Sequence, residues 1–524
     1  MSFILALLLI LQGQNTVGFR IAGQVVSASG NPVLGARVSI YVPGHADKQL
    51  SVVNGDNGEF AFTDLAPGKY SLQVNNHGRA EGYLEYQEYS TAIAVGPGLD
   101  TEHIRFEIHP GAQISGSVLD EAGDAVRNGS VYLFARWMYR GSPMTGLRQT
   151  KTTGNDGSFH FTHLEPGTYY VAVAGRPWYS RPQVQVQQFA GRGNAITTVP
   201  NPELDVCYPL TYYSGAISAE AATPIEVEPG SNVEIHFTLQ PAAAVHVTLD
   251  GLVNTAERRV NASWRVAGPG GTIFDVPPTW GNETGVAICP GTYRISTDEW
   301  VNNQMAAYGS QDVTLTSDTT VRLADAVKTS VTGKILFEGQ FPPGIAVLLE
   351  GVNNTNQAPA FVEKDGSFDM RDVAPGRYNL RLANTEELYM KSIAVKGSGK
   401  FSNGALELNR GAKVELTIQV ARGVGQIDGV ALREGQAMAG AMVLAIPQDF
   451  SHGNYIPRDQ SDSDGTFSLR YAWPGKYLVV AIDDGRELAY ADGAVMQPYR
   501  AKAVEVTVPS AEASRVQVEV QRRR

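Results

Sequence analysis

The residue types that perform catalysis or bind metals are present in this chain but are not clustered. His160 and His163 are the closest pair among nine histidines, and three positions apart on a strand they would face opposite sides, so they predict no shared metal. Asp462-Ser463-Asp464-Gly465 has the charges of a calcium loop, but no glutamate follows at the offset of the bidentate ligand, which favours a tight turn. No His-Glu-x-x-His, Gly-x-Ser-x-Gly or phosphate-binding glycine loop occurs. We therefore expect no enzyme activity, no metal and no cofactor.

Aromatic side chains form the candidate binding site. Trp137 and Tyr139 follow an expected strand at 131–134, and Trp178 and Tyr179 follow another at 169–173. Planar rings of this kind bind sugars and also serve protein contacts. The four rings could together present flat faces at one end of a domain. The alternative is that they pack under a neighbouring insertion as a small separate core, since Trp is buried on average.

The two cysteines, Cys207 and Cys289, lie in different predicted domains. In an exported chain they could form a disulfide that joins those domains. Otherwise they are buried thiols, because free cysteine is usually interior.

A repeated pair of turns must position all of these residues. The first turn is Asp-Gly, as in Asp156-Gly157, and the phenylalanines that follow it alternate as on the buried face of a strand. The second is Pro-Gly-x-Tyr, in which we expect a type II turn with glycine at positive φ. We expect each tyrosine ring to pack inward and its hydroxyl to bond the backbone. The five copies of the second turn are Pro67, Gly68 and Tyr70; Pro166, Gly167 and Tyr169; Pro290, Gly291 and Tyr293; Pro375, Gly376 and Tyr378; and Pro474, Gly475 and Tyr477.

The spacing of the copies predicts the domain organisation. In four copies the turn glycine and the proline are nine residues apart, and the third copy keeps only the Pro-Gly half. A strand with an apolar residue two positions before a glycine opens most units, and an alternating apolar strand closes each. The 524 residues thus predict an all-β tandem array of about five small antiparallel β-sandwich domains. The expected ranges are 19–110, 111–241 with an insertion at 176–228, 242–326 (degenerate), 327–421 and 422–524.

The N-terminus and the overall charge restrict location and partners. Phe3 to Leu11 is an unbroken apolar run, too short to span a bilayer but suited to a signal peptide over residues 1–18. A buried first strand is the alternative. No other segment is long enough for a transmembrane span. The net charge of -11 argues against a nucleic-acid or anionic-membrane partner, because both attract concentrated Lys and Arg.

These motifs together resemble a known family. The Ile/Val-x-Gly opening, Gly35-Ala36-Arg37-Val38, Asp-Gly-x-Phe and Pro-Gly-x-Tyr are similar to the carboxypeptidase regulatory-like domain, a transthyretin-like or immunoglobulin-like sandwich, as it occurs in secreted bacterial repeat proteins. The zinc-ligand spacing of the peptidase itself is absent from the sequence. The resemblance implies an exported binding protein that is periplasmic, secreted or on the cell surface. Its partner would be a polysaccharide or an envelope protein, and the alternative function is a structural spacer or protein-interaction stalk.

Overall fold

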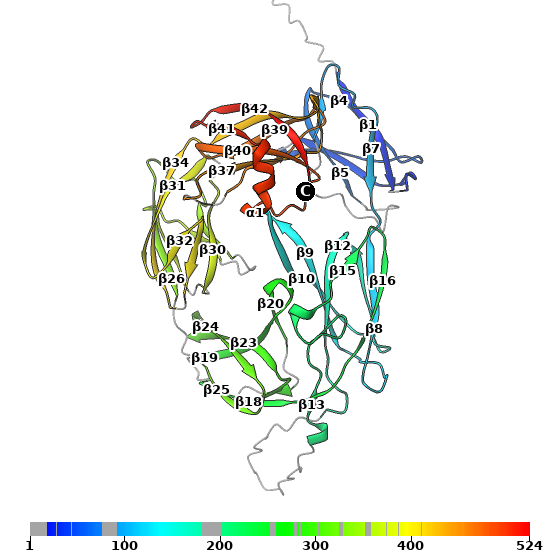
Figure 1. Cartoon of the computed structure of the whole chain (residues 1–524), viewed down its shortest axis with the longest axis vertical. Coiled ribbons are helices and arrows are strands. Elements are labelled where there is room, and N and C mark those ends of the chain that lie inside the picture. Colours follow the sequence, from blue (N-terminus) through cyan, green and yellow to red (C-terminus); the bar gives the residue numbers. More distant parts are fainter. Residues whose placement is uncertain are drawn as a thin grey trace, which may run out of the picture. The chain divides into compact units, whose positions relative to one another are not determined.

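The computed structural model describes most of the chain, and almost all of the regular secondary structure in the described part is β-strand (Figure 1). One short α-helix stands among these residues, α1 (Gly493–Met496). None of the helices in this part has the length or apolar character to cross a membrane. The predicted signal peptide, residues 1–18, falls almost entirely outside the described residues. The structure describes residues 18–27, 29–42, 45–75, 92–180, 202–251, 258–276, 280–281, 285–301, 304–323, 329–351, 358–371, 373, 375–385, 387–409, 411–451, 453 and 455–524.

The chain divides into two compact units, Met1–Pro110 with Val430–Ala441 and Gln460–Phe467, and Gly111–Gly429 with Met442–Asp459 and Ser468–Arg524. In the first unit two sheets, ordered β4-β1-β7 and β3-β2-β5-β6, enclose one core. Ile21 and Val25 of one sheet meet Ile40 and Leu72 of the other in this core. The strands are β1 (Phe19–Ser27), β2 (Arg37–Val42), β3 (His45–Val53), β4 (Glu59–Leu65), β5 (Gly68–Asn75), β6 (Ile93–Val95) and β7 (Ile104–Ile108).

The second unit begins with a sandwich of the same plan. Its sheets are β11-β8-β16 and β10-β9-β12-β14, with β15 also paired to β12. Because β14 and β15 belong to the predicted insertion, the described part of that insertion extends the sheet. The elements are β8 (Ala112–Leu119), β9 (Ser130–Tyr139), β10 (Ser142–Thr152), β11 (Ser158–Leu164), β12 (Gly167–Ala174), η1 (Pro202–Leu204), β13 (Val206–Cys207), β14 (Thr211–Tyr212), η2 (Ala219–Ala221), β15 (Ile225–Val227) and β16 (Asn232–Thr238).

Residues 242–323 form another pair of sheets in the second unit, ordered β21-β22-β18-β25 and β20-β19-β23-β24. Their core also contains Tyr132 and Phe134 of β9, so this sandwich shares its apolar cluster with the preceding one. The elements are β17 (Ala242–Ala243), β18 (Val245–Asp250), β19 (Arg258–Ala267), η3 (Pro269–Gly271), β20 (Ile273–Asp275), β21 (Trp280–Gly281), β22 (Gly285–Ile288), β23 (Gly291–Val301), β24 (Gln304–Leu315) and β25 (Thr319–Arg322).

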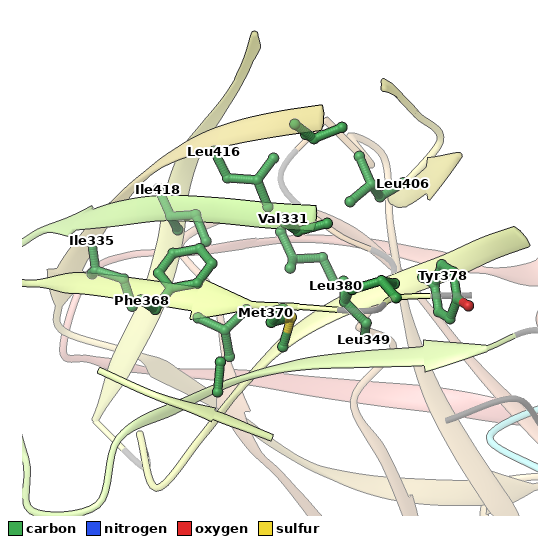
Figure 2. Close-up of a cluster of buried hydrophobic side chains, with 14 of the residues drawn as sticks. Val331, Ile335, Leu349, Phe368, Met370, Tyr378, Leu380, Leu406, Leu416 and Ile418 are labelled. Atoms are coloured by element: carbon green, nitrogen blue, oxygen red, sulfur yellow. The ribbon is translucent and has the colours of Figure 1, made fainter. Parts of the chain in front are cut away.

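A third sandwich of the second unit has a densely filled core, shown in Figure 2. Val331, Phe368 and Leu416 come from the sheet β29-β26-β34-β31, and Leu349 and Leu380 from the sheet β28-β27-β30-β33-β32. The strands are β26 (Ser330–Leu336), β27 (Ala346–Gly351), β28 (Ala360–Phe361), β29 (Ser367–Met370), β30 (Gly376–Ala383), β31 (Leu388–Gly397), β32 (Lys400–Ser402), β33 (Ala405–Leu408) and β34 (Lys413–Arg422).

The C-terminal residues are divided between the two units. In the second unit β40 pairs with β37, β41 and β42, and a cluster that includes Leu444, Val480 and Tyr499 lies under α1 and η4. The elements are β35 (Gly425–Arg433), β36 (Gln436–Ala437), β37 (Met442–Pro447), β38 (Arg458–Gln460), β39 (Thr466–Ala472), β40 (Gly475–Asp483), η4 (Gln497–Lys502), β41 (Val504–Val508) and β42 (Ala513–Arg522).

The predicted fold class, an all-β array of small sandwiches, is confirmed. We propose the first four predicted ranges as domains, because the facing sheets described above each take their strands from one range, whereas the predicted range 422–524 is divided between the two units. The small pair β13-β17 connects residues on the two sides of the boundary at 241.

The sandwiches are mostly antiparallel, as predicted, and each of the first four also contains one parallel pairing of strands. The opening and closing strands pair in parallel in four cases: β1 with β7, β8 with β16, β18 with β25 and β26 with β34. This pairing explains the opening-strand glycine. A Cβ on Gly23, Gly116 or Gly333 would lie 2.0, 1.8 or 2.4 Å from a carbonyl oxygen of the closing strand.

The Asp-Gly turns have the predicted backbone. Gly58, Gly157, Gly366 and Gly465 have φ between 73 and 86°, a region that favours glycine. In three of the turns the aspartate carboxylate also accepts hydrogen bonds from the N–H and the hydroxyl of the residue two positions later in the sequence. These pairs are Asp156 with Ser158, Asp365 with Ser367 and Asp464 with Thr466.

The Pro-Gly turns differ from the predicted type II geometry. That turn needs φ near +80° at its glycine, whereas Gly167, Gly291, Gly376 and Gly475 have φ of 154 to 159° and are the first residues of strands. Each glycine thus continues directly into an extended strand. The tyrosine two positions later is buried in all five copies. Its hydroxyl donates to the carbonyl four residues earlier in four of them, Tyr70 to Ala66, Tyr169 to Glu165, Tyr293 to Cys289 and Tyr477 to Trp473, at 2.8 to 2.9 Å.

Candidate functional site

The four candidate aromatic residues do not form one site. β9 and β12 are antiparallel, with Ala174 opposite Ser130 and Tyr169 opposite Ala135. Trp178 therefore follows β12 at the end where β9 begins, while Trp137 lies seven residues further along β9, about 23 Å at 3.3 Å per residue. The prediction that the rings share one end of the domain is wrong, because adjacent antiparallel strands end on opposite sides.

Trp137 and Tyr139 lie near the tip of the β9-β10 hairpin. The guanidinium of Arg148 lies 4.5 Å from the centre of the Trp137 ring, and that of Arg140 lies 5.4 Å from the Tyr139 ring. Trp137 is half-buried, and Tyr139 is 45% exposed. Both rings are thus covered on one face by arginine, which restricts their use as open sugar-binding platforms.

Trp178 and Tyr179 lie in a separate cluster around Glu121. The two rings meet edge to face with centroids 5.7 Å apart, and Trp178 is 81% exposed, so it is not part of a small buried core. The Glu121 carboxylate accepts hydrogen bonds from the hydroxyls of Tyr179 and Tyr208. Burial works to raise the pKa of Glu121, but hydrogen bonds from the Tyr179 hydroxyl, the Glu121 backbone and the Tyr208 hydroxyl together outweigh it, and the pKa is lowered. Burial and the hydrogen bond to Glu121 raise the pKa of Tyr179 to about 12.

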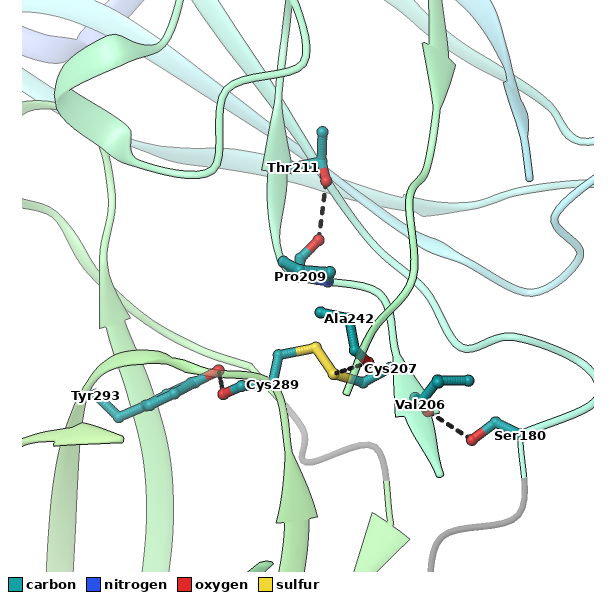
Figure 3. The surroundings of a disulfide bond; sticks show 8 residues. All are labelled: Ser180, Val206, Cys207, Pro209, Thr211, Ala242, Cys289 and Tyr293. Atoms are coloured by element: carbon teal, nitrogen blue, oxygen red, sulfur yellow. Dashed lines mark hydrogen bonds between the residues drawn. A yellow bond between two sulfur atoms is a disulfide. The ribbon is translucent and has the colours of Figure 1, made fainter. Parts of the chain in front are cut away.

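Cys207 and Cys289 form a disulfide with their Cα atoms 5.7 Å apart, and both are buried. Of the two alternatives left open by the sequence, the structure has the bridge (Figure 3). Hydrogen bonds support both ends: the Ser180 hydroxyl donates to the Val206 carbonyl at 2.7 Å, and Tyr293 donates to the Cys289 carbonyl at 2.8 Å. The bridge therefore ties the predicted insertion to the core of residues 242–323.

Packing and charge reinforce the same junction. The Phe274 ring lies 5.1 Å from that of Tyr132 and 5.0 Å from that of Phe134 on β9. His246 of β18 lies between two carboxylates, 3.1 Å from Asp205 and 3.2 Å from Asp318. Such an interface, with aromatic rings, a disulfide and a contact between His246 and Asp205, holds two sandwiches in one arrangement.

A cavity that the sequence did not predict lies elsewhere in the second unit. Its volume is about 230 Å³. The walls come from β30 and β31 on one side and from the segment before β38 and the end of β39 on the other. The lining residues are Leu380, Arg381, Leu382, Thr385, Leu388, Met390, Gly453, Tyr455, Tyr471 and Trp473.

The residues first considered as metal ligands are turn residues or surface side chains in the structure. Gly465 N–H donates to the Asp462 carbonyl at 2.8 Å, which closes the turn, and the Asp462 carboxylate pairs with Lys69 in the first unit. His160 and His163 are both exposed. Across the described ranges, no three His, Cys, Asp or Glu side chains come close enough together to hold a metal ion.

Comparison with protein families identifies the first sandwich. Residues 20–107 match the sequence model of the carboxypeptidase regulatory-like domain. This is the range of β1 to β7, with the opening glycine, the Asp-Gly-type turn and the Pro-Gly-x-Tyr motif described above. No curated protein matches the chain in sequence.

Comparison with solved structures matches the chain to a TIE protein and to pilin subunits. The chain is 10% identical to the Bacillus anthracis TIE protein, with 96% of this chain and 69% of that one covered and a TM-score of 0.16. The major pilin subunit BcpA of Bacillus cereus, in a D312A form, is 10% identical, with 78% and 99% covered and a TM-score of 0.16. The shaft pilin SpaA of Lactobacillus rhamnosus GG is 8% identical, with 43% and 98% covered and a TM-score of 0.21. At these scores the chains do not superpose as wholes, and the likeness carries no argument about function.

Proposed function

We propose, on the premise that residues 20–107 form a carboxypeptidase regulatory-like domain, that this chain is a non-catalytic protein of an oxidising compartment outside the cytoplasm. Its sandwiches would hold interaction surfaces in fixed positions, as a structural or protein-binding component of the cell envelope. The described residues form turns, hydrophobic cores and contacts between sandwiches, and the reactive side chains among them are not grouped at one place.

The disulfide between Cys207 and Cys289 is the observation that carries this proposal. Thiol pairs stay reduced in most cytosolic proteins and are oxidised in the periplasm or outside the cell. The bridge also connects residues of two different predicted domains. A link at this position resists separation of the two sandwiches, which suits a component that maintains a distance or a geometry.

Thiol labelling in intact cells of the source organism tests the proposal. The cells are quenched with acid, and the protein is then treated with a maleimide-polyethylene glycol reagent that reacts with free thiols. Without reductant the protein should remain unmodified, and after reduction it should carry two adducts, because the two cysteines are paired with each other. The matched control is Cys207→Ala, which frees Cys289 and should give one adduct in denaturant without reductant. Two adducts on the unreduced wild-type protein would place it in a reducing compartment and contradict the proposal.

A second candidate function is the binding of a polysaccharide or another envelope component, and the exposure of Trp178 favours it. This ring is 81% exposed beside Tyr179, whereas burial is the usual state of tryptophan. In a glycan-binding screen Trp178→Ala should weaken any sugar binding about tenfold. Trp137→Ala is the control, since that ring is covered by Arg148. Binding that is lost equally in both variants, or no binding to any glycan, would reject Trp178 as a sugar platform.

A further inference from the structure

The cavity in the second unit is suited to a single ring. Its volume of about 230 Å³ is below the roughly 300–1,000 Å³ of pockets that bury whole drug-sized ligands. Tyr455 and Trp473 form part of the wall, with ring centroids 6.0 Å apart and planes inclined by 31°. Leu380, Leu388 and Met390 complete it and are themselves 1, 5 and 3% exposed.

The leucine and methionine side of the cavity disfavours a sugar, although Arg381, Thr385, Tyr455, Tyr471 and Trp473 in the same lining carry polar groups. A pyranose bound there would bring hydroxyl groups against leucine and methionine side chains that offer no hydrogen-bond partner, and each unpaired hydroxyl lowers affinity. A phenyl or indole ring has no such groups on its faces. The Met390 thioether also makes favourable contacts with aromatic rings.

Backbone geometry keeps this cavity open. Tyr471 has φ of 58°, a conformation that is rare for a bulky residue, and its side chain remains 44% exposed beside the cavity. The corresponding positions of two other copies, Asp64 and His163, have φ of 58 and 57°, so the kink belongs to the repeat. In the same lining, a Cβ on Gly453 would lie 3.2 Å from Trp473 and 3.4 Å from Met390, so a side chain there would narrow the space.

The charged groups near the cavity favour a ligand with negative charge. Arg381 lines it, with its guanidinium 5.9 Å from the Tyr455 ring centre and 3.7 Å from Glu350. Arg140 also acts electrostatically on Glu350 and Tyr455. The β9-β10 hairpin that carries Arg140 is held at its tip by a hydrogen bond from Ala491 N–H to the Gly141 carbonyl at 3.0 Å. Two guanidinium groups against one carboxylate leave a local excess of positive charge.

We infer that this cavity binds an aromatic side chain of a partner protein that carries a carboxylate close to the ring. Buried aromatic anchors with arginine beside them are the side chains that dominate protein interfaces. This inference rests on the proposed function in one respect, because the partner protein must lie outside the cytoplasm. The thiol-labelling experiment tests that location separately, so the two can fail independently.

Calorimetric titration of the full chain with capped peptides tests the inference. Acetyl-Gly-Glu-Trp-Glu-Gly-amide should bind with Kd on the order of 1 mM, a value expected for one ring in a small pocket. Acetyl-Gly-Glu-Ala-Glu-Gly-amide should not bind detectably. The charge-reversed Gly-Lys-Trp-Lys-Gly peptide should bind at least about threefold more weakly, because of the positive charge near the ring.

Variants of the chain assign the binding to the cavity. Tyr471→Asn removes the ring but suits positive φ, so the fold is retained and the Glu-Trp-Glu peptide should bind about fivefold more weakly. Phe361→Ala, at a residue that is 68% exposed and outside the cavity lining, should bind as wild type. Binding of glucuronate or neutral oligosaccharides in preference to the Trp peptide, equal binding of the Ala peptide, or no effect of Tyr471→Asn would each overturn the inference.

Discussion

Replacing Gly116 with alanine is expected to destabilise residues 111–241 by about 3 kcal/mol. The new Cβ would lie 1.8 Å from the Ile235 carbonyl oxygen and 2.9 Å from Cζ of Phe159. The first of these atoms is backbone of β16, which pairs in parallel with β8 through seven residues. Relief of the clash must therefore separate the two strands, and it cannot be achieved by rotating one side chain.

Gly123→Ala separates this steric cost from the conformational cost of losing a glycine. Gly123 has φ of 88° and no atom within 4 Å of its ideal Cβ, so its substitution should cost about 1 kcal/mol from backbone strain alone. Urea unfolding of both variants gives the comparison, and hydrogen exchange of the β8 and β16 amides locates the damage. Equal destabilisation by the two substitutions would show that close approach of β16 does not determine the glycine at 116.

Much of the fold was predictable because turns leave strong local signals. The Asp-Gly glycines need positive φ, and the tyrosines after Pro-Gly are buried, as their sequence context indicates. The partner of each opening strand was not predictable from alternation, since a period of two specifies a face but not the direction of the neighbouring strand. Gly116 does indicate this pairing, because a glycine inside a strand often marks a place where another backbone approaches closely.

The candidate site was less predictable because it depends on register and on contacts between distant residues. Trp137 and Trp178 looked adjacent on the assumption that both strands end on the same side, and the antiparallel register of β9 and β12 separates them. The cavity combines Leu380 with Trp473, more than ninety residues away in sequence. Nothing in the sequence around Tyr471 indicates its conformation. The pattern becomes visible when the described repeats are compared in the structure, because the residue six positions after the turn glycine has positive φ in three of them.

Removal of the disulfide is expected to lower stability by about 4 kcal/mol. The cross-link joins residues 82 positions apart, and for a loop of that length the loss of chain entropy in the unfolded state predicts a stabilisation of this size. The degenerate sandwich at 242–326 should respond most, because Cys289 lies in its core beside Tyr293, whose hydroxyl bonds the Cys289 carbonyl. The packing of Phe274 on β9 remains without the bridge, so the change should weaken the junction rather than unfold the whole chain.

Urea unfolding of the wild-type protein reduced with dithiothreitol should show the loss due to the cross-link alone, because the reduced protein keeps both sulfur atoms. The Cys207→Ala, Cys289→Ala double variant should be less stable by a further amount of about 1 kcal/mol per site, because it also loses buried volume at both positions. The difference between the two losses separates the cross-link from that volume. If reduction leaves the unfolding midpoint unchanged, the contacts of Phe274 and the contact between His246 and Asp205 are sufficient to hold the junction, and the bridge contributes no stability to it.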